Sequence, residues 1–142
     1  MDKVKIDTLE YDNGGVYNGE CLGNLRHGKG TYTQNGVSLI GTWTNNHLNG
    51  EGVMNSVAFK YEGEFKNSLR HGVGKEIHKD GTIYQGEFAY GKRHGKMKIF
   101  LTNGAIIDCV FDSGVGVGEG VMTMTDGEKV SVYFKNGNLF FK

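Results

Sequence analysis

The sequence has 142 residues, of which 24 are glycine and none is proline, and its 16 basic residues balance 16 acidic ones. Zero net charge gives no bulk attraction to nucleic acid, so we expect no nucleic-acid partner. No apolar run approaches the roughly 18 residues of a membrane helix, and the regular spacing of the apolar residues is not typical of a disordered chain.

A segment of similar sequence returns at nearly constant intervals along the chain. Its copies are YNGECLGNLRHGKGTY at 17–32, a weaker LIGTWTNNHLNGEGVM at 39–54, YEGEFKNSLRHGVGKE at 61–76 and YQGEFAYGKRHGKMKI at 84–99. The third residue of each copy is a framework glycine, and these glycines follow one another after 22, 22 and 23 residues: Gly19, Gly41, Gly63 and Gly86. Two further steps of 23 reach Cys109 and Val132, where the pattern fades. Such a period predicts a stacked array of one small structural unit.

Within each copy the side chains alternate between two faces. Tyr61, Gly63 and Phe65 share one face, and the residues between them share the other, which is the period of a β-strand. A short turn region, NSLRHG in this copy, precedes a second strand that begins near Gly72. The copies are separated by dipeptides that tolerate positive φ and favour tight hairpin loops. These dipeptides are Asn13-Gly14, Asn35-Gly36, Asp80-Gly81, Asn103-Gly104 and Asp126-Gly127.

Hairpins joined in this way predict an all-β fold. We expect an elongated, twisted, single-layer antiparallel sheet of tandem β-hairpins, with about 12 strands. Residues 1–10 are expected to form an N-terminal capping strand around Ile6–Leu9, and residues 11–142 to form the repeat array. That array would hold about five repeats and a partial C-terminal one.

A single-layer sheet lacks a second layer against which to bury its apolar face. Glycine recurs eleven residues after the framework position, at Gly30, Gly52, Gly74 and Gly120. Because glycine has no side chain, a neighbouring aromatic ring can lie over the backbone there, and a ladder of such rings would form a thin core. The expected aromatic row comprises Tyr17, Trp43, Tyr61, Phe65, Tyr84, Phe88, Phe111 and Phe134.

The two cysteines, Cys21 and Cys109, lie about four repeats apart in the sequence. At roughly 10 Å per repeat they would be ~40 Å apart, far beyond the ~7 Å between Cα atoms that a disulfide allows. We therefore expect free thiols, a reducing compartment and a cytoplasmic location. The N-terminal segment MDKVKIDTLEYDNGG also lacks the apolar core of a signal peptide.

These residues resemble the MORN repeat, whose pattern runs here from Tyr61-Glu62-Gly63-Glu64-Phe65 to His71-Gly72-Val73-Gly74. The resemblance covers residues 11–137 and implies a sheet of tandem hairpins without catalytic activity or cofactors. It also implies a scaffold that binds proteins in cytoskeletal or membrane-associated assemblies, and phospholipid binding has been proposed for some members. The copies depart from the pattern at Cys21, Met97, Cys109 and Val132, which fits the atypical terminal repeats of such arrays.

Repeated polar residues are the candidate chemistry of the chain. Arg-His-Gly recurs at 26–28, 70–72 and 93–95, and we interpret these segments as corners with turn-forming histidines. Two imidazoles that share a zinc ion need nitrogens ~3.4 Å apart, whereas neighbouring repeats lie ~10 Å apart, so we expect no metal site. Glu20, Glu64 and Glu87 recur at the repeat period, which favours a contact with a neighbouring backbone or basic corner over catalysis.

Two functions remain open from the sequence. The first is a noncatalytic scaffold that binds a protein partner along the aromatic-lined face, although the same rings could be wholly structural. Its candidate contact residues are Trp43, Tyr61, Phe65, Tyr84, Phe88 and Phe111. The second is peripheral binding of anionic phospholipid, since each basic residue at an anionic surface contributes about 1 kcal/mol. Its candidate residues are Arg70, Lys92, Arg93, Lys96 and Lys98.

The C-terminal end of the array is rich in apolar residues, including Val121, Met122, Met124, Phe134, Leu139, Phe140 and Phe141. An exposed sheet edge with aromatic side chains invites pairing with another strand. A homodimer through this end is therefore an alternative to the simpler interpretation of these residues as a terminal cap.

Overall fold

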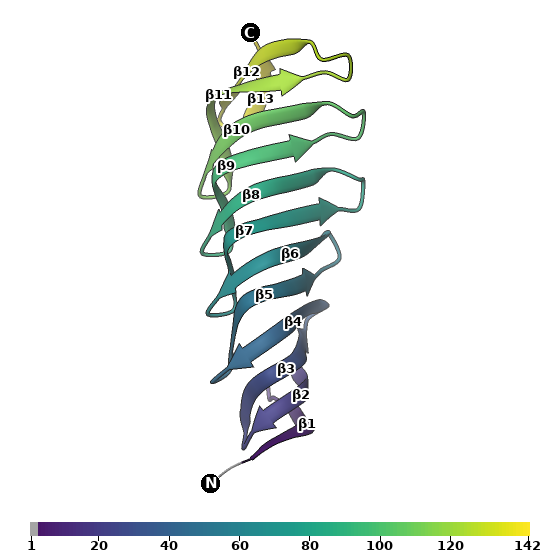
Figure 1. Cartoon of the computed structure of the whole chain (residues 1–142), viewed down its shortest axis with the longest axis vertical. Coiled ribbons are helices and arrows are strands. Elements are labelled where there is room, and N and C mark those ends of the chain that lie inside the picture. Colours follow the sequence, from purple (N-terminus) through teal and green to yellow (C-terminus); the bar gives the residue numbers. More distant parts are fainter. Residues whose placement is uncertain (1–2) are drawn as a thin grey trace. The chain divides into compact units, whose positions relative to one another are not determined.

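The computed structural model describes residues 3–142 and confirms the all-β fold. Thirteen strands form one open antiparallel sheet, in which neighbours in sequence are also neighbours in the sheet (Figure 1). The strands are β1 (Val4–Glu10), β2 (Val16–Leu22), β3 (Leu25–Gln34), β4 (Val37–Thr44), β5 (His47–Asn55), β6 (Phe59–Lys66), β7 (Leu69–His78), β8 (Ile83–Ala89), β9 (Lys92–Phe100), β10 (Ile106–Asp112), β11 (Val115–Thr123), β12 (Lys129–Lys135) and β13 (Asn138–Phe141). Of the expected N-terminal segment 1–10, β1 is present and residues 1 and 2 lie outside the described part.

The structure has one strand more than the sequence predicted, because the chain turns once more after β12. Asn136 and Gly137 adopt φ values of 53° and 78°, as a two-residue hairpin turn requires. Residues Asn138–Phe141 then pair with β12 in antiparallel register, with Phe134 opposite Leu139.

Two kinds of turn connect the strands. Four of the predicted Asn-Gly and Asp-Gly dipeptides lie in three-residue loops, at residues 12–14, 79–81, 102–104 and 125–127. In each loop the Asn or Asp side chain accepts a hydrogen bond from the backbone N–H two residues on, as Asn103 Oδ1 does from Ala105 N at 2.9 Å. Asn35-Gly36 instead forms a two-residue turn with φ values of 50° and 77°. The predicted dipeptides are therefore turns, but most belong to loops one residue longer than a tight hairpin.

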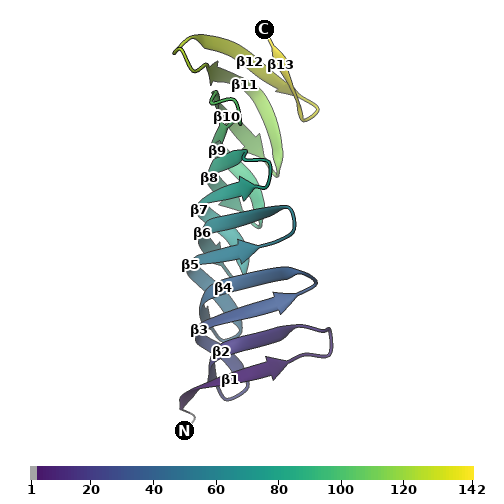
Figure 2. The same cartoon turned by 90° about the vertical axis from the view of Figure 1, so that its right-hand side faces the viewer.

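The chain divides into two compact units, with the boundary between Leu69 and Arg70 at the start of β7. Within each unit the hairpins lie side by side in chain order (Figures 1 and 2). The residues that the structure describes form no helix and no second sheet. No helix in this part of the chain could therefore span a membrane. Each unit has to bury its apolar side chains within a single layer.

The first unit buries aromatic rings over glycine. The Tyr17 ring covers Gly30 so closely that a methyl group added to this glycine would lie 2.2 Å from Tyr17 Oη. The Tyr17 hydroxyl donates to the Glu20 carbonyl at 2.6 Å, and burial raises the pKa of Tyr17 to about 12. Phe65 lies in the same way against Gly52. The prediction that glycine makes room for a thin aromatic core is confirmed in this unit.

The second unit fills part of the same core with other apolar side chains. Met97, Cys109 and Val132 occupy positions that carry glycine in other copies, and all three are buried beside Ile107 and Met122. Both cysteines of the chain are free thiols. Burial raises the pKa of the Cys109 thiol to about 11, which favours the protonated thiol at neutral pH.

Candidate binding surface

The aromatic residues proposed as partner contacts lie mostly in the core. Trp43, Tyr61, Phe65, Phe88 and Phe111 are each at most 6% exposed, and Tyr84 is half-buried. Their polar atoms point to backbone as well: Trp43 Nε1 donates to the Gly30 carbonyl at 3.0 Å, and the Tyr61 hydroxyl donates to the Glu64 carbonyl at 2.9 Å. Burial and these hydrogen bonds give the five buried rings a structural role in each unit.

The Arg-His-Gly segments are strand residues and not corners, so that part of the prediction is wrong. Arg26 lies in β3, Arg70 in β7 and Arg93 in β9. The turns come just before them, at pairs such as Asn67-Ser68 and Tyr90-Gly91, where both residues have positive φ. A hairpin turn needs only these two residues, so the chain is already extended when it reaches the arginine.

Two of the three histidines of these segments, His71 and His94, connect successive hairpins. His71 Nδ1 accepts a hydrogen bond from the backbone N–H of Tyr90 at 3.2 Å, and His94 Nδ1 accepts one from Ser113 at 3.0 Å. Each acceptor therefore holds a turn residue of the following hairpin. Their role is structural, as the sequence predicted, although they bind a turn and do not form one. Among residues 3–142, no group of three or more His, Cys, Asp or Glu side chains could hold a metal ion.

In the first unit, Arg26 lies among aromatic rings. Its guanidinium carbon is 4.5 Å from the Tyr32 ring centroid, 5.0 Å from that of Trp43 and 5.2 Å from that of Tyr11. One terminal nitrogen donates to the Asn46 carbonyl at 2.9 Å. The ring faces attract the cation, so Arg26 acts as a packing residue between two hairpins.

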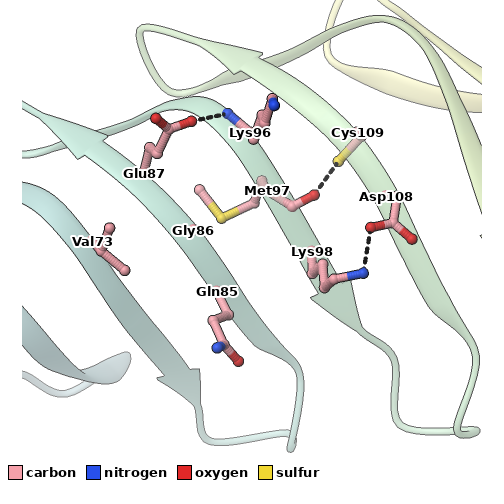
Figure 3. Close-up of a pocket in the computed structure, with 9 residues that line it drawn as sticks. All are labelled: Val73, Gln85, Gly86, Glu87, Lys96, Met97, Lys98, Asp108 and Cys109. Atoms are coloured by element: carbon pink, nitrogen blue, oxygen red, sulfur yellow. Dashed lines mark hydrogen bonds and ion pairs between the residues drawn. The ribbon is translucent and has the colours of Figure 1, made fainter.

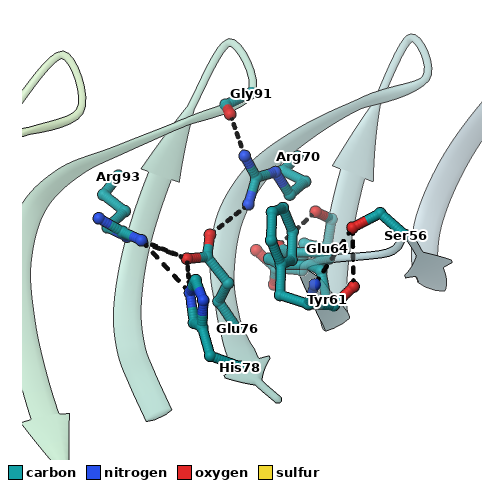
Figure 4. Close-up of polar contacts among 9 residues, drawn as sticks. Ser56, Tyr61, Glu64, Arg70, Glu76, His78, Gly91 and Arg93 are labelled. Carbon is teal, nitrogen blue, oxygen red and sulfur yellow. Dashed lines mark hydrogen bonds and ion pairs between the residues drawn. The ribbon is translucent and has the colours of Figure 1, made fainter. Parts of the chain in front are cut away.

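In the second unit, a buried carboxylate holds two arginines (Figure 4). Glu76 is 2% exposed, and its two oxygens accept hydrogen bonds at 2.5 Å from Arg70 and from Arg93. His78 Nε2 lies 2.6 Å from Glu76 Oε1, and Arg70 also donates to the Gly91 carbonyl at 2.5 Å. Burial by itself would raise the pKa of Glu76, but the hydrogen bonds from Arg93, His78 and Arg70 hold it below the usual value.

Sequence reasoning did not single out Glu76, although one signal was available. The corresponding residues of the other copies are Tyr32, Met54 and Ile99, so a carboxylate stands where an uncharged side chain is usual. A charged residue at a core position needs opposite charges, and Arg70 and Arg93 were already known from the repeat. The Glu76 cluster comprises Arg70, Glu76, His78 and Arg93.

The basic residues proposed for lipid binding are divided between the two faces of the second unit. Arg70 and Arg93 point into the Glu76 cluster, and their side chains are 15% and 22% exposed. The side chains of Lys92, Lys96 and Lys98 are exposed instead. We call the face that carries them the outward face; it also bears Val73, Gln85, Glu87, Asp108, Val110 and Val117.

The recurring glutamates stabilise a bulge in the second strand of a hairpin. Glu87 Oε2 accepts a hydrogen bond from the Lys96 backbone N–H at 2.6 Å, beside Gly95 with φ of 105°. Glu20 Oε1 accepts one from Lys29 N at 2.8 Å in the same position of the first copy. The prediction of a lattice contact to a neighbouring backbone is confirmed for these two glutamates.

A hollow of about 610 Å³ lies on the outward face of the second unit (Figure 3). Its lining residues are Val73, Gln85, Gly86, Glu87, Lys96, Met97, Lys98, Asp108 and Cys109. Lys98 Nζ forms an ion pair with Asp108 Oδ1 at 2.6 Å across its rim. Hollows of roughly 300–1,000 Å³ are typical of small binding sites.

The fold and this surface define a class: an array of tandem β-hairpin repeats with an open sheet and exposed faces. A family model described as the MORN repeat matches residues 17–36, 40–56, 61–83 and 84–96, and no other domain is detected. These matches span just over half of the sequence, and the chain belongs to the MORN-repeat family. The family is generally noncatalytic. A comparison with curated proteins gives no match. The hairpins continue beyond the last family match, through β13.

Proposed function

We propose that this chain is a noncatalytic scaffold that binds a protein partner on the outward face of its second unit. The observation that carries the proposal is a strip of exposed valines on this face. Val110 and Val117 lie directly opposite each other on β10 and β11 and are 44% and 38% exposed. Val121 on β11 is exposed by a similar fraction. Contiguous exposed apolar side chains are typical of protein interaction sites.

The choice of face follows from burial. The sequence favoured the aromatic face, but five of its six candidate residues are buried in their own unit. A partner could contact them only through the half-buried Tyr84 or through small exposed edges. The outward face offers apolar side chains that are already accessible, so binding there would not require the core to open.

The test is site-specific crosslinking with matched variants. A photo-crosslinker placed at Val121 should capture one saturable partner protein from the cell of origin, and the double variant Val110→Asp/Val117→Asp with the same crosslinker should lose it. Val57, which is 74% exposed in the first unit, provides the control substitution Val57→Asp. Absence of any saturable partner, or equal loss in both variants, would contradict the proposal. Family resemblance suggests a cytoskeletal or membrane-associated partner, which cell fractionation would identify.

Anionic phospholipid is the second candidate ligand, supported by Lys92, Lys96 and Lys98 on one face. Cosedimentation with phosphatidylserine vesicles over a salt series would detect it, because such binding weakens as salt screens the charges. Reversal of the three lysine charges should abolish this binding. If the chain sedimented with the vesicles equally at all salt concentrations, or did not sediment with them at low salt, binding of anionic phospholipid through these lysines would be ruled out.

Self-association through β13 is a further proposal. This strand is hydrogen-bonded to β12 on one side, and its residue Phe141 is 63% exposed. Light scattering over a concentration series would show a mass that rises toward a dimer, whereas a constant monomer mass would contradict it.

A further inference from the structure

The hollow of the second unit has a counterpart at the same position of the repeat in the first unit. The counterpart measures about 400 Å³ and is lined by Asn18, Gly19, Lys29, Gly30, Thr31, Ile40, Gly41 and Thr42. Both hollows lie along residues that pair across adjacent strands, Gly19–Gly30–Gly41 in one and Gly86–Met97–Cys109 in the other. The repeat itself therefore produces the hollow in each unit.

A lysine at the same repeat position lies on the rim of each hollow. Lys29 and Lys96 both come twelve residues after the first residue of their copies. Each follows a bulge glycine, and each has its backbone N–H held by the recurring glutamate, Glu20 or Glu87. A β-bulge of this kind re-aims the side chain that follows it, so the fold fixes where these two lysines emerge.

The ammonium groups of these lysines form no ion pair within the part of the chain that the structure describes. On the rim of the larger hollow, Asp108 is paired with Lys98, and Glu87 already accepts the backbone N–H of Lys96. No ion pair involves Lys96 Nζ or Lys29 Nζ among residues 3–142. Each hollow thus presents one lysine without an ion pair beside a floor without charged side chains, and on the rim of the larger hollow the Glu87 carboxylate is bound to the backbone of the bulge.

We propose that the hollow beside Lys96 binds a carboxylate side chain carried by an extended segment of the partner protein, and that the hollow beside Lys29 binds another. The proposal rests on the proposed scaffold function and names the chemistry of its partner: an acidic, extended polypeptide with apolar residues next to the carboxylates. The apolar neighbours would contact the floor, and the carboxylate would neutralise the lysine.

The local charges favour a peptide over a membrane surface. Glu87 and Asp108 lie on the same rim as Lys96, so an anionic membrane pressed against this face would meet two carboxylates as well as the lysines. A peptide can place a single carboxylate against Lys96 and neutral groups near the two acids. It can also enter a hollow, which a flat surface of headgroups does not do.

The experiment measures binding of two fluorescent synthetic peptides to the full chain by anisotropy. In one, glutamate alternates with valine; in the other, glutamine replaces every glutamate. We expect the acidic peptide to bind about tenfold more tightly than the neutral one, and Lys96→Glu to weaken it by about tenfold, which corresponds to roughly 1.4 kcal/mol. Lys129→Glu is the control, because Lys129 is an exposed lysine on β12 that does not line either hollow.

Amide chemical shifts should move most at Gln85, Lys96 and Asp108 in the same titration, and circular dichroism would verify that both variants are folded. Equal binding of the two peptides, or equal effects of Lys96→Glu and Lys129→Glu, would overturn the proposal. So would Lys96-dependent binding of phosphatidylserine vesicles without any binding of the acidic peptide.

This outcome is separable from the test of the scaffold function. If Val110→Asp/Val117→Asp releases the crosslinked partner and Lys96→Glu retains it with unchanged affinity, the scaffold stands and the acidic-segment proposal fails. If the acidic peptide binds through Lys96 but no saturable partner is captured, the site stands and the scaffold proposal fails.

Discussion

Arg26 in the first unit and Arg93 in the second occupy the same position of the repeat but have different neighbours. Arg26 lies among three aromatic rings and forms no ion pair among residues 3–142. Arg93 lies 3.6 Å from the Tyr84 ring centroid and also binds Glu76. The position is thus an arginine–aromatic packing site in both units, and an ion pair is added where the preceding copy supplies a carboxylate. The same residue of the repeat can therefore keep its position while the interactions that stabilise it differ between units.

The positions that carry glycine in most copies differ between the units in a similar way. In the first unit Gly30 and Gly52 leave space in the second strand of a hairpin, and the rings of Tyr17 and Phe65 occupy it. In the second unit Met97, Cys109 and Val132 bring their own side chains into the core. The second unit therefore depends less on the aromatic-over-glycine arrangement, which explains how its last hairpins form although the repeat pattern fades.

The largest expected effect is on the Glu76 cluster. Glu76→Gln leaves the guanidinium groups of Arg70 and Arg93 without their counter-charge in a mostly buried place, and should lower the free energy of unfolding by about 3 kcal/mol. Urea unfolding would measure it. The control is Asp108→Asn, which breaks an exposed pair with Lys98 and should cost less than about 1 kcal/mol. Similar losses in the two variants would mean that the cluster adds little to stability.

The arginine comparison itself can be tested by the substitution Arg→Met at both sites. Arg93→Met removes hydrogen bonds to buried Glu76 and should cost about 2–3 kcal/mol. Arg26→Met keeps an unbranched apolar side chain among the rings and loses one hydrogen bond to Asn46, so about 1 kcal/mol is expected. Thermal unfolding of both variants checks the order; a larger loss for Arg26→Met would reverse our interpretation.

The glycine comparison predicts strain in the first unit. Gly30→Ala would place a methyl group against the Tyr17 ring and should cost about 2 kcal/mol, in the range typical of overpacked cores. The cost should shrink in a Tyr17→Leu background, because the smaller side chain leaves room. If the destabilising effects of Gly30→Ala and Tyr17→Leu were simply additive, the close contact between the Tyr17 ring and Gly30 would not be the cause of the loss.

The smallest expected effect is a pH dependence confined to the second unit. The folded-state pKa of Glu76 lies below its ordinary value of 4.5, so the stability that its charge provides is complete above that value. It is lost as the pH falls through the lowered folded-state pKa, where the carboxylate becomes protonated. Unfolding midpoints measured from neutral to strongly acidic pH should fall more steeply for the wild type than for Glu76→Gln. Parallel curves would assign the acid sensitivity to other groups.

Much of the fold could be predicted because the repeat period and the two-residue alternation are local properties of the sequence. The period located the hairpins, and the second-strand glycines Gly30 and Gly52 correctly indicated rings lying over backbone. The extra strand β13 escaped prediction because the repeat pattern fades at Val132, although its turn, Asn136-Gly137, lies at the same repeat position as Asn67-Ser68 and Tyr90-Gly91. The corners were misplaced because Arg-His-Gly is polar and glycine-containing, as turns are, whereas the turns lie at pairs such as Asn67-Ser68 and Tyr90-Gly91, and the glycine of each segment has a positive φ inside a strand.

The site was less predictable, since it depends on which side chains meet across strands. Sequence alternation placed Lys96 and Lys98 on one face, but Asp108, which neutralises Lys98, comes from the next hairpin. The packing of Trp43 likewise depends on groups from other strands, the Tyr17 ring on β2 and the Gly30 carbonyl on β3.

The sequence by itself determined the architecture of this protein: a β-hairpin per period, glycine at the framework position and a noncatalytic repeat family. Those features follow from φ preferences, side-chain alternation and spacing, which act within a few residues. The tertiary structure decided which faces are available. Only packing between hairpins buries the aromatic row, turns Arg70 and Arg93 toward Glu76, and leaves Lys96 unpaired beside a hollow, because the burial and pairing of a side chain depend on neighbours that the chain brings together by folding.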